Sequence, residues 1–278
     1  MALGDKGTGG SRGKGLRRLL EDWITVPGER ADPSFFRAGL VMALGTLCLT
    51  LLHFVVLSGE YQGLVADALA DRCASDPEGV SGAVACALAP LGRQVAWTLG
   101  CWALYVIVPA LAIRFVLRRP LVDFGLSPRG FLRHLPVYLV LAIPVLGLVW
   151  WVSHSPAFLA TYPFYRNPEG WLDLALWEGL YLSQFFALEF FFRGFWVHGT
   201  KDRMGILSVF AMLAPYVMIH FTKPFREALG ALVAGLVLGV LSLRTRSIWG
   251  GFFIHGLVAV SMDLAALWQR GWFFGAGT

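Results

Sequence analysis

The sequence predicts an all-α protein, a polytopic membrane helix bundle of about seven transmembrane helices. Of its 278 residues, 56% are hydrophobic and only 15% are charged, and the mean hydropathy is +0.63. A soluble domain usually carries about a quarter of charged residues, and so much apolar surface cannot be buried in one water-soluble globule of this length. Several apolar runs also approach the roughly 20 residues that a bilayer core requires. Soluble enzymes, disordered chains and disulfide scaffolds are thereby excluded.

Residues 1–34 form a basic segment, rich in glycine, which we expect on the cytoplasmic side. Two interpretations fit it. Leu16, Leu19, Leu20, Trp23 and Ile24 recur at helical spacing beside basic residues, which is typical of an amphipathic helix on a membrane surface. The alternative is a solvated basic tail. The segment does not resemble a removable signal peptide, because no short apolar stretch with a small-residue cleavage site follows it.

Residues 35–272 are expected to form one transmembrane domain. The seven predicted spans are 36–58, 94–116, 135–153, 171–198, 205–222, 227–243 and 247–268. The span 227–243 is short and rich in small residues, and Gly235 and Gly239 form a pair that lets helix backbones approach closely. We therefore expect this span to lie inside the bundle.

The distribution of Lys and Arg predicts the orientation. The N-terminal segment is basic, and so are the connections at 117–134, 199–204 and 244–246, whereas the 59–92 loop is acidic. Because basic residues gather in cytoplasmic loops, we expect a multi-pass protein with a cytoplasmic N-terminus. The expected location, which the charge distribution does not itself indicate, is the bacterial inner membrane. This topology also accounts for the net charge of +5. The lipid bilayer is the expected partner, and no nucleic acid is.

The predicted outer loop at 59–92 holds two cysteines and one motif-like sequence. Cys73 and Cys86 could form a disulfide bond outside the cytoplasm, or they could be two unrelated thiols. Gly79-Val80-Ser81-Gly82 matches the nucleophile motif GxSG of rhomboid serine proteases. We treat this match as chance, because it lies in a polar outer loop where no spanning helix is expected.

The last four predicted helices carry ionisable residues, which are costly in a membrane and usually mark function. Glu189 and Arg193 are four residues apart, on one helix face, and can neutralise each other. His220 ends the next helix, and its distance from the 201–203 turn puts it at a depth similar to that of Glu189. His255 and Asp263 lie on the last helix. These residues also have structural interpretations. Glu189 and Arg193 could be only an ion pair, the two histidines could be packed residues of the bundle, and Asp263 could hydrogen-bond to a neighbouring helix.

Such a cluster suits the activation of water. A carboxylate in a low-dielectric pocket can serve as general base, and an imidazole can stabilise the oxyanion that forms at a peptide carbonyl. No cofactor is required. Zinc is the runner-up, because His and Glu are normal zinc ligands, although the HExxH motif of many zinc proteases is absent.

The motifs of this region resemble the CPBP family of CAAX prenyl endopeptidases, bacteriocin-processing proteins and relatives, which are intramembrane glutamic proteases. The family pattern is EExxxR, then FxxxH, then HxxxN or HxxxD. The segments 189–194, 216–220 and 255–259 are similar to these motifs in the same order, with Tyr216 in place of Phe, and a Gly-rich stretch separates the second from the third. The resemblance covers roughly 170–270.

The resemblance implies an intramembrane endopeptidase that acts on membrane-associated or exported proteins or peptides. Glu189 would be the base, His220 its partner on the water, His255 the oxyanion stabiliser and Arg193 the residue that orients Glu189, with Asp263 in support. Two positions depart from the family: Leu188 replaces the first glutamate, and Ala259 replaces the Asn or Asp of the last motif. The alternative is therefore a non-catalytic membrane scaffold or immunity protein. A transporter is disfavoured, because no paired repeat with broken helices is visible.

Overall fold

The computed structural model describes residues 32–166 and 168–275, and these residues form helices and connections without a strand. The N-terminal segment up to residue 31, with its predicted surface helix, lies outside the described residues. Helix α2 (Pro33–Leu51) begins at Asp32, whose carboxylate accepts hydrogen bonds from the backbone N–H groups of Ser34 and Phe35. Pro33 occupies the first turn, where its missing N–H costs nothing.

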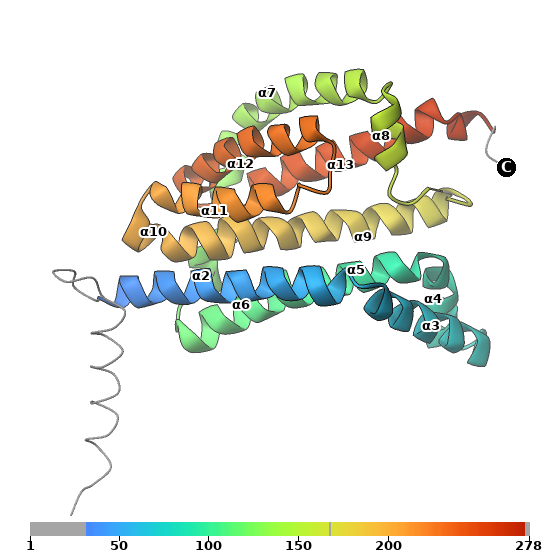
Figure 1. Cartoon of the computed structure of the whole chain (residues 1–278), viewed down its shortest axis with the longest axis horizontal. Coiled ribbons are helices and arrows are strands. Elements are labelled where there is room, and N and C mark those ends of the chain that lie inside the picture. Colours follow the sequence, from blue (N-terminus) through green and yellow to red (C-terminus); the bar gives the residue numbers. More distant parts are fainter. Residues whose placement is uncertain (1–31, 167, 276–278) are drawn as a thin grey trace, which may run out of the picture.

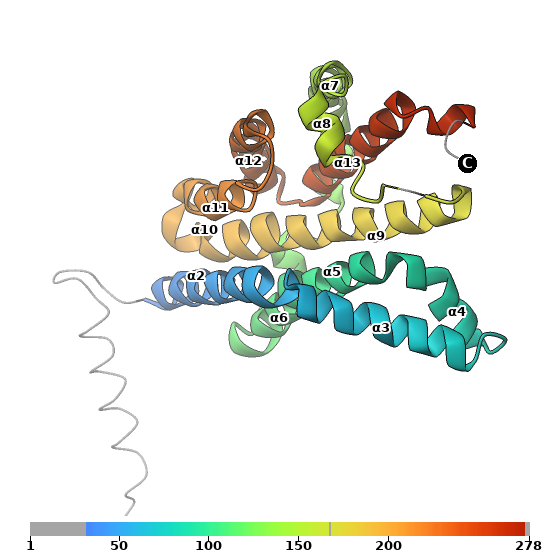
Figure 2. The ribbon, with the colours of Figure 1, turned by 45° about the vertical axis from the view of Figure 1, so that its right-hand side comes forward.

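Helix α9 (Trp171–Glu189) and its π-helical continuation Phe190–His198 run through the middle of the molecule. Both views show the remaining helices on its two sides (Figures 1 and 2). One side holds α2, α3 (Gly59–Ser75), α4 (Val80–Leu88), α5 (Gly92–Trp102) and α6 (Val108–Leu111). The other holds α7 (Arg129–Val152), α8 (Pro156–Thr161), α10 (Gly199–Met204), α11 (Leu207–Met218), α12 (Phe225–Thr245) and α13 (Trp249–Gln269).

Five helical segments of the described residues are long and apolar enough to cross a membrane: Pro33–Val56, Val80–Val116, Leu121–Val152, Phe225–Thr245 and Trp249–Gln269. They agree with five of the seven predicted spans. The other two predicted spans are also helical. The segment 171–198 carries three carboxylates and one arginine, and Leu207–Met218 is apolar but has only 12 residues. The protein is therefore an all-α, polytopic membrane bundle.

The core is densest around the π-helical segment. Phe190, Phe191, Phe192 and Phe195 are all buried there, and the ring of Tyr105 stacks on Phe191 with 4.4 Å between ring centroids. Buried aromatic rings contribute much of the packing energy of such a core. π-helical turns are frequent at functional sites, but Leu52–Val56, Ala103–Ile107 and Ala112–Val116 are π-helical as well, so this conformation alone does not mark the segment as functional.

Helix α12 packs closely on α11, as the pair of glycines predicts. The expectation that it lies inside the bundle is wrong, because only 28% of its apolar stretch is buried and side chains such as Leu229 and Val233 are exposed. A methyl group on Gly235 would meet Leu213 and Tyr216, and one on Gly239 would meet Val209. The absence of a side chain at these two positions brings the backbones together. The close contact positions Tyr216, which is part of the cluster described below.

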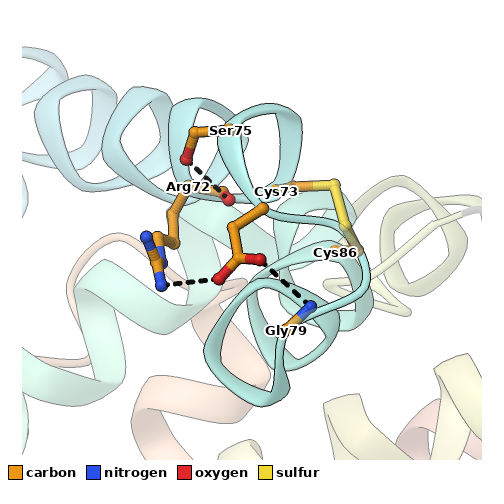
Figure 3. Close-up of a disulfide and its surroundings, with 6 residues drawn as sticks. Arg72, Cys73, Ser75, Gly79 and Cys86 are labelled. Atoms are coloured by element: carbon orange, nitrogen blue, oxygen red, sulfur yellow. Dashed lines mark hydrogen bonds and ion pairs between the residues drawn. A yellow bond between two sulfur atoms is a disulfide. The ribbon is translucent and has the colours of Figure 1, made fainter.

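The segment 59–92 is not the loop that its polarity suggested. It folds into α3 and α4, whose ends are joined by a disulfide bond between Cys73 and Cys86 (Figure 3). Ser58 caps α3 by accepting a hydrogen bond from the backbone N–H of Tyr61. Short capped helices do not need the long apolar run by which we identified spans. Ser81 of the GxSG sequence is exposed and hydrogen-bonds to Arg72, so it belongs to no buried site.

The basic connections meet at one end of the bundle. Arg37 near the start of α2 pairs with Asp202 of α10, and residues of the 117–134, 199–206 and 243–246 connections line one cavity. The α3–α4 hairpin lies at the opposite end (Figure 1). The predicted grouping of these connections on one side is thus present in the fold, and their assignment to the cytoplasm stays a prediction.

Candidate active site

Glu189 ends α9 at the point where the π-helix begins, and its side chain is fully buried. Arg193, also fully buried, places Nη1 2.9 Å from Glu189 Oε1. Two charges removed from water in this way must neutralise each other, because either one alone would be strongly destabilising. The predicted ion pair therefore exists, and it is buried.

His255 of α13 completes the environment of the carboxylate. Its Nδ1 lies 2.6 Å from Glu189 Oε1. An ionised carboxylate can only accept, so Nδ1 carries the hydrogen, and Nε2 of a neutral ring is then an acceptor. The Tyr216 hydroxyl lies 2.8 Å from that Nε2 and can donate to it. Glu189 thereby fixes the tautomer and orientation of His255.

Tyr216 connects the remaining members of the cluster. The Arg193 guanidinium lies over its ring, 4.2 Å from the centroid, in a cation–π contact. Its backbone carbonyl lies 2.8 Å from His220 Nδ1, and the two rings are 4.9 Å apart. Since a carbonyl only accepts, His220 Nδ1 carries the hydrogen and its Nε2 is left as an acceptor. His220 does not hydrogen-bond to Glu189 in the described structure.

Gly251 of α13 brings this helix against the cluster, and the neighbouring Gly250 brings it against α7. A methyl group on Gly251 would overlap Glu189 Oε2, and one on Gly250 would overlap the Tyr138 ring. Oε2 is buried and has no hydrogen-bond partner among the described residues. One carboxylate oxygen is thus held by His255 and Arg193, and the other faces the α13 backbone at Gly251.

Asp263 lies apart from this cluster. It is fully buried and accepts a hydrogen bond from Trp177 Nε1 at 2.7 Å. Eight residues of α-helix place it about 12 Å from His255 along α13, which is too far for contact with Glu189. The structure therefore separates Asp263 from the four residues with which we grouped it.

Sequence reasoning named four of the five side chains that the structure brings together: Glu189, Arg193, His220 and His255. It did not assign a role to Tyr216. The signal was present, because Tyr stands where the motif has Phe and so adds a hydroxyl group to a buried position. Among the described residues, no group of three or more His, Cys, Asp or Glu side chains is placed to hold a metal ion.

The fold and this cluster define an integral membrane protein with a buried Glu–Arg–His site. Residues 170–261, which contain the whole cluster, match the family model of type II CAAX prenyl endopeptidases, Rce1-like. This match confirms, over that segment, the resemblance predicted from the ordered motifs. No curated protein and no solved structure matches the chain.

Proposed function

We propose that this protein is an intramembrane endopeptidase that hydrolyses peptide bonds of membrane-associated or exported proteins. The observation that carries the proposal is the 2.6 Å contact between Glu189 and His255, with Arg193 paired to the same carboxylate oxygen. The Rce1-like match supports the reaction class. A carboxylate that orients an imidazole is a recurrent arrangement for proton transfer in hydrolases.

The different burial of its members favours different roles for the carboxylate and for the two imidazoles of the cluster. Glu189 is fully buried, whereas His220 and His255 are partly exposed. Water therefore meets an imidazole before it meets the carboxylate. We infer that Glu189 and His255 act as one base, in which Glu189 supports the positive charge that His255 acquires. This role replaces the oxyanion stabilisation that the resemblance implied for His255, and His220 Nε2 accepts a hydrogen bond from the same water.

The proton balance of the step follows from this arrangement. Water gives a proton to His255 Nε2 while its oxygen attacks the peptide carbonyl carbon, and the carbonyl oxygen becomes an oxyanion. The single lone pair of Nε2 cannot accept from Tyr216 and from water at once, so the Tyr216 hydroxyl turns from Nε2 to the peptide carbonyl oxygen before this transfer and donates to the oxyanion that forms there. The proton on His255 then passes to the leaving amine, the carbon–nitrogen bond breaks, and the neutral imidazole is restored.

Leu188 stands where the family has its first glutamate. The π-helix that begins at Phe190 is a local change of helix geometry by which Glu189 can take over that role. A displacement of one residue rotates a side chain by about 100° around a helix, and a π-turn is the local change that absorbs one residue of displacement. Leu188 packs against the hydrophobic core, and the only carboxylate next to it is Glu189. We infer that Glu189 serves where the family uses its first glutamate.

The test is a Glu189→Gln variant in cells, compared with wild type for the processing of membrane and exported proteins. Glu178→Gln on the same helix is the matched control, because Glu178 is not in the cluster. We expect unprocessed substrates to accumulate with Glu189→Gln and not with Glu178→Gln. Unchanged processing at normal expression of Glu189→Gln would favour the scaffold alternative, which Leu188 supports.

The zinc alternative needs its own experiment. Activity of the purified protein is measured in a strong chelator, and its metal content is determined. Chelator-resistant activity is the expected result for a base made of Glu189 and His255. Loss of activity in the chelator, restored by added zinc, would show that the same peptide-bond hydrolysis uses a metal ion.

A further inference from the structure

A cavity of about 770 Å³ opens at the end of the bundle where the basic connections meet. Its charged lining residues are Arg119, Arg129, Lys201, Arg246 and Asp123. The one carboxylate is already occupied, since Asp123 pairs with Arg119 at 3.1 Å. The wall of this cavity is therefore strongly positive. It is separate from the Glu189 cluster, none of whose members lines it.

Holding these positive charges around one cavity costs free energy. Arg246 has a φ of 54°, in the left-handed region that side chains other than Gly and Asn rarely adopt. Burial lowers the pKa of Lys201, the carboxylate of Asp202 partly opposes this, and the positive charge of Arg246 lowers the pKa further. Like charges that repel one another around one hollow are stabilised when an anion enters it.

The other lining residues indicate what kind of anion fits. Val122 and Ile206 are half or more exposed, and Leu243 also lines the cavity. Apolar side chains beside cationic ones at the end of a membrane bundle suit a ligand with a charged group and a hydrocarbon portion. Guanidinium groups bind phosphate oxygens through paired N–H donors.

We propose that this cavity, lined by Arg119, Arg129, Lys201 and Arg246, binds a phosphate group, which an anionic phospholipid headgroup or a free phosphate ion supplies. The site is independent of the proteolytic activity. The apolar rim favours the lipid as the source, because inorganic phosphate would leave Val122, Ile206 and Leu243 in contact with water.

The test measures ligand retention and thermal stabilisation of the purified full-length protein in a neutral detergent. The probes are phosphatidylglycerol, phosphatidylcholine and inorganic phosphate. We expect phosphatidylglycerol to be retained and to raise the Tm, and phosphatidylcholine to do neither. A rise in Tm with inorganic phosphate alone would identify the ion as a sufficient ligand of the same site. Equal effects of the two lipids would overturn the proposal.

A double variant of two exposed arginines is expected to fold normally and to lose part of the positive charge of the cavity. Arg246→Gly removes a charge at a backbone position that glycine favours, and Arg129→Ala removes an exposed charge from the first turn of α7. Together they should weaken phosphatidylglycerol binding on the order of tenfold. Arg133→Ala with Arg244→Ala is the matched control, because both arginines are exposed neighbours outside the cavity. Equal binding by the variant and the control would also overturn the proposal.

Discussion

Glu189 Oε1 lies 2.6 Å from His255 Nδ1, and this contact joins the end of α9 to the second turn of α13. The two residues are 66 positions apart in the chain. The same oxygen is paired with Arg193, so one carboxylate oxygen holds both a fixed cation and an imidazole. The first three predictions test whether these contacts serve chemistry or only packing.

Arg193→Ala should abolish most activity and destabilise the fold. It leaves a buried carboxylate without its cation, which typically costs about 3–5 kcal/mol. Such a carboxylate escapes by taking up a proton, so residual activity should recover as pH rises. Arg193→Lys keeps the charge but not the planar fork and should retain part of the activity. The pH–rate profiles of purified variants decide this. A profile of Arg193→Ala with the wild-type shape, only lower, would place the action of Arg193 elsewhere.

Tyr216→Phe tests the hydroxyl group that sequence reasoning left unassigned. If the hydroxyl donates to the oxyanion, its removal should lower kcat by on the order of 100-fold with little change in KM. The protein should still fold, because the ring and its contacts with Arg193 and His220 stay. The measurement is steady-state kinetics on one identified substrate. Full activity would show that the family's Phe is equivalent here.

Gly251→Ala should inactivate the protein although glycine is no catalytic group. The added methyl group overlaps Glu189 Oε2, so either α13 or the carboxylate must move, and the His255 contact is lost. Gly230→Ala is a control, because a methyl group there meets nothing within 4 Å. Activity and Tm are measured for both variants. A fully active Gly251→Ala would mean that the contact between Glu189 and His255 tolerates displacement.

Asp263→Asn should affect stability more than catalysis. Its carboxylate accepts a hydrogen bond from Trp177 and lies two helical turns from His255, so the substitution keeps an acceptor for Trp177. We expect Asp263→Asn to retain most of its activity and to show a change in Tm. Complete inactivation at normal expression and Tm would instead indicate that Asp263 assists catalysis, as we first expected.

The orientation is tested with single cysteines at exposed positions. Arg244→Cys should resist a membrane-impermeant thiol reagent in intact cells, and Asp67→Cys should react, because the Lys/Arg distribution puts residue 244 inside and residue 67 outside. Cys48 and Cys101 are buried and give little background. Labelling of Arg244→Cys from outside would reverse the topology.

Composition and apolar run length by themselves determined the helix bundle, because the hydrophobic requirement of a membrane span is a local property of the chain. The motif spacing also determined that Glu189 and Arg193 face the same way, since four residues make about one helical turn. Whether Cys73 and Cys86 are bridged was left open, because a disulfide depends on the path of the chain between them.

Only the tertiary structure decided which residues meet across helices. It placed His255, rather than His220, on Glu189, inserted Tyr216 between the two imidazoles, and put Asp263 out of reach. These outcomes depend on the crossing and depth of α9, α11 and α13, which are fixed by close contacts at glycines such as Gly235 and Gly251 and by a π-helix after Glu189. A helical period gives the face of a residue, but packing against other helices gives its partner.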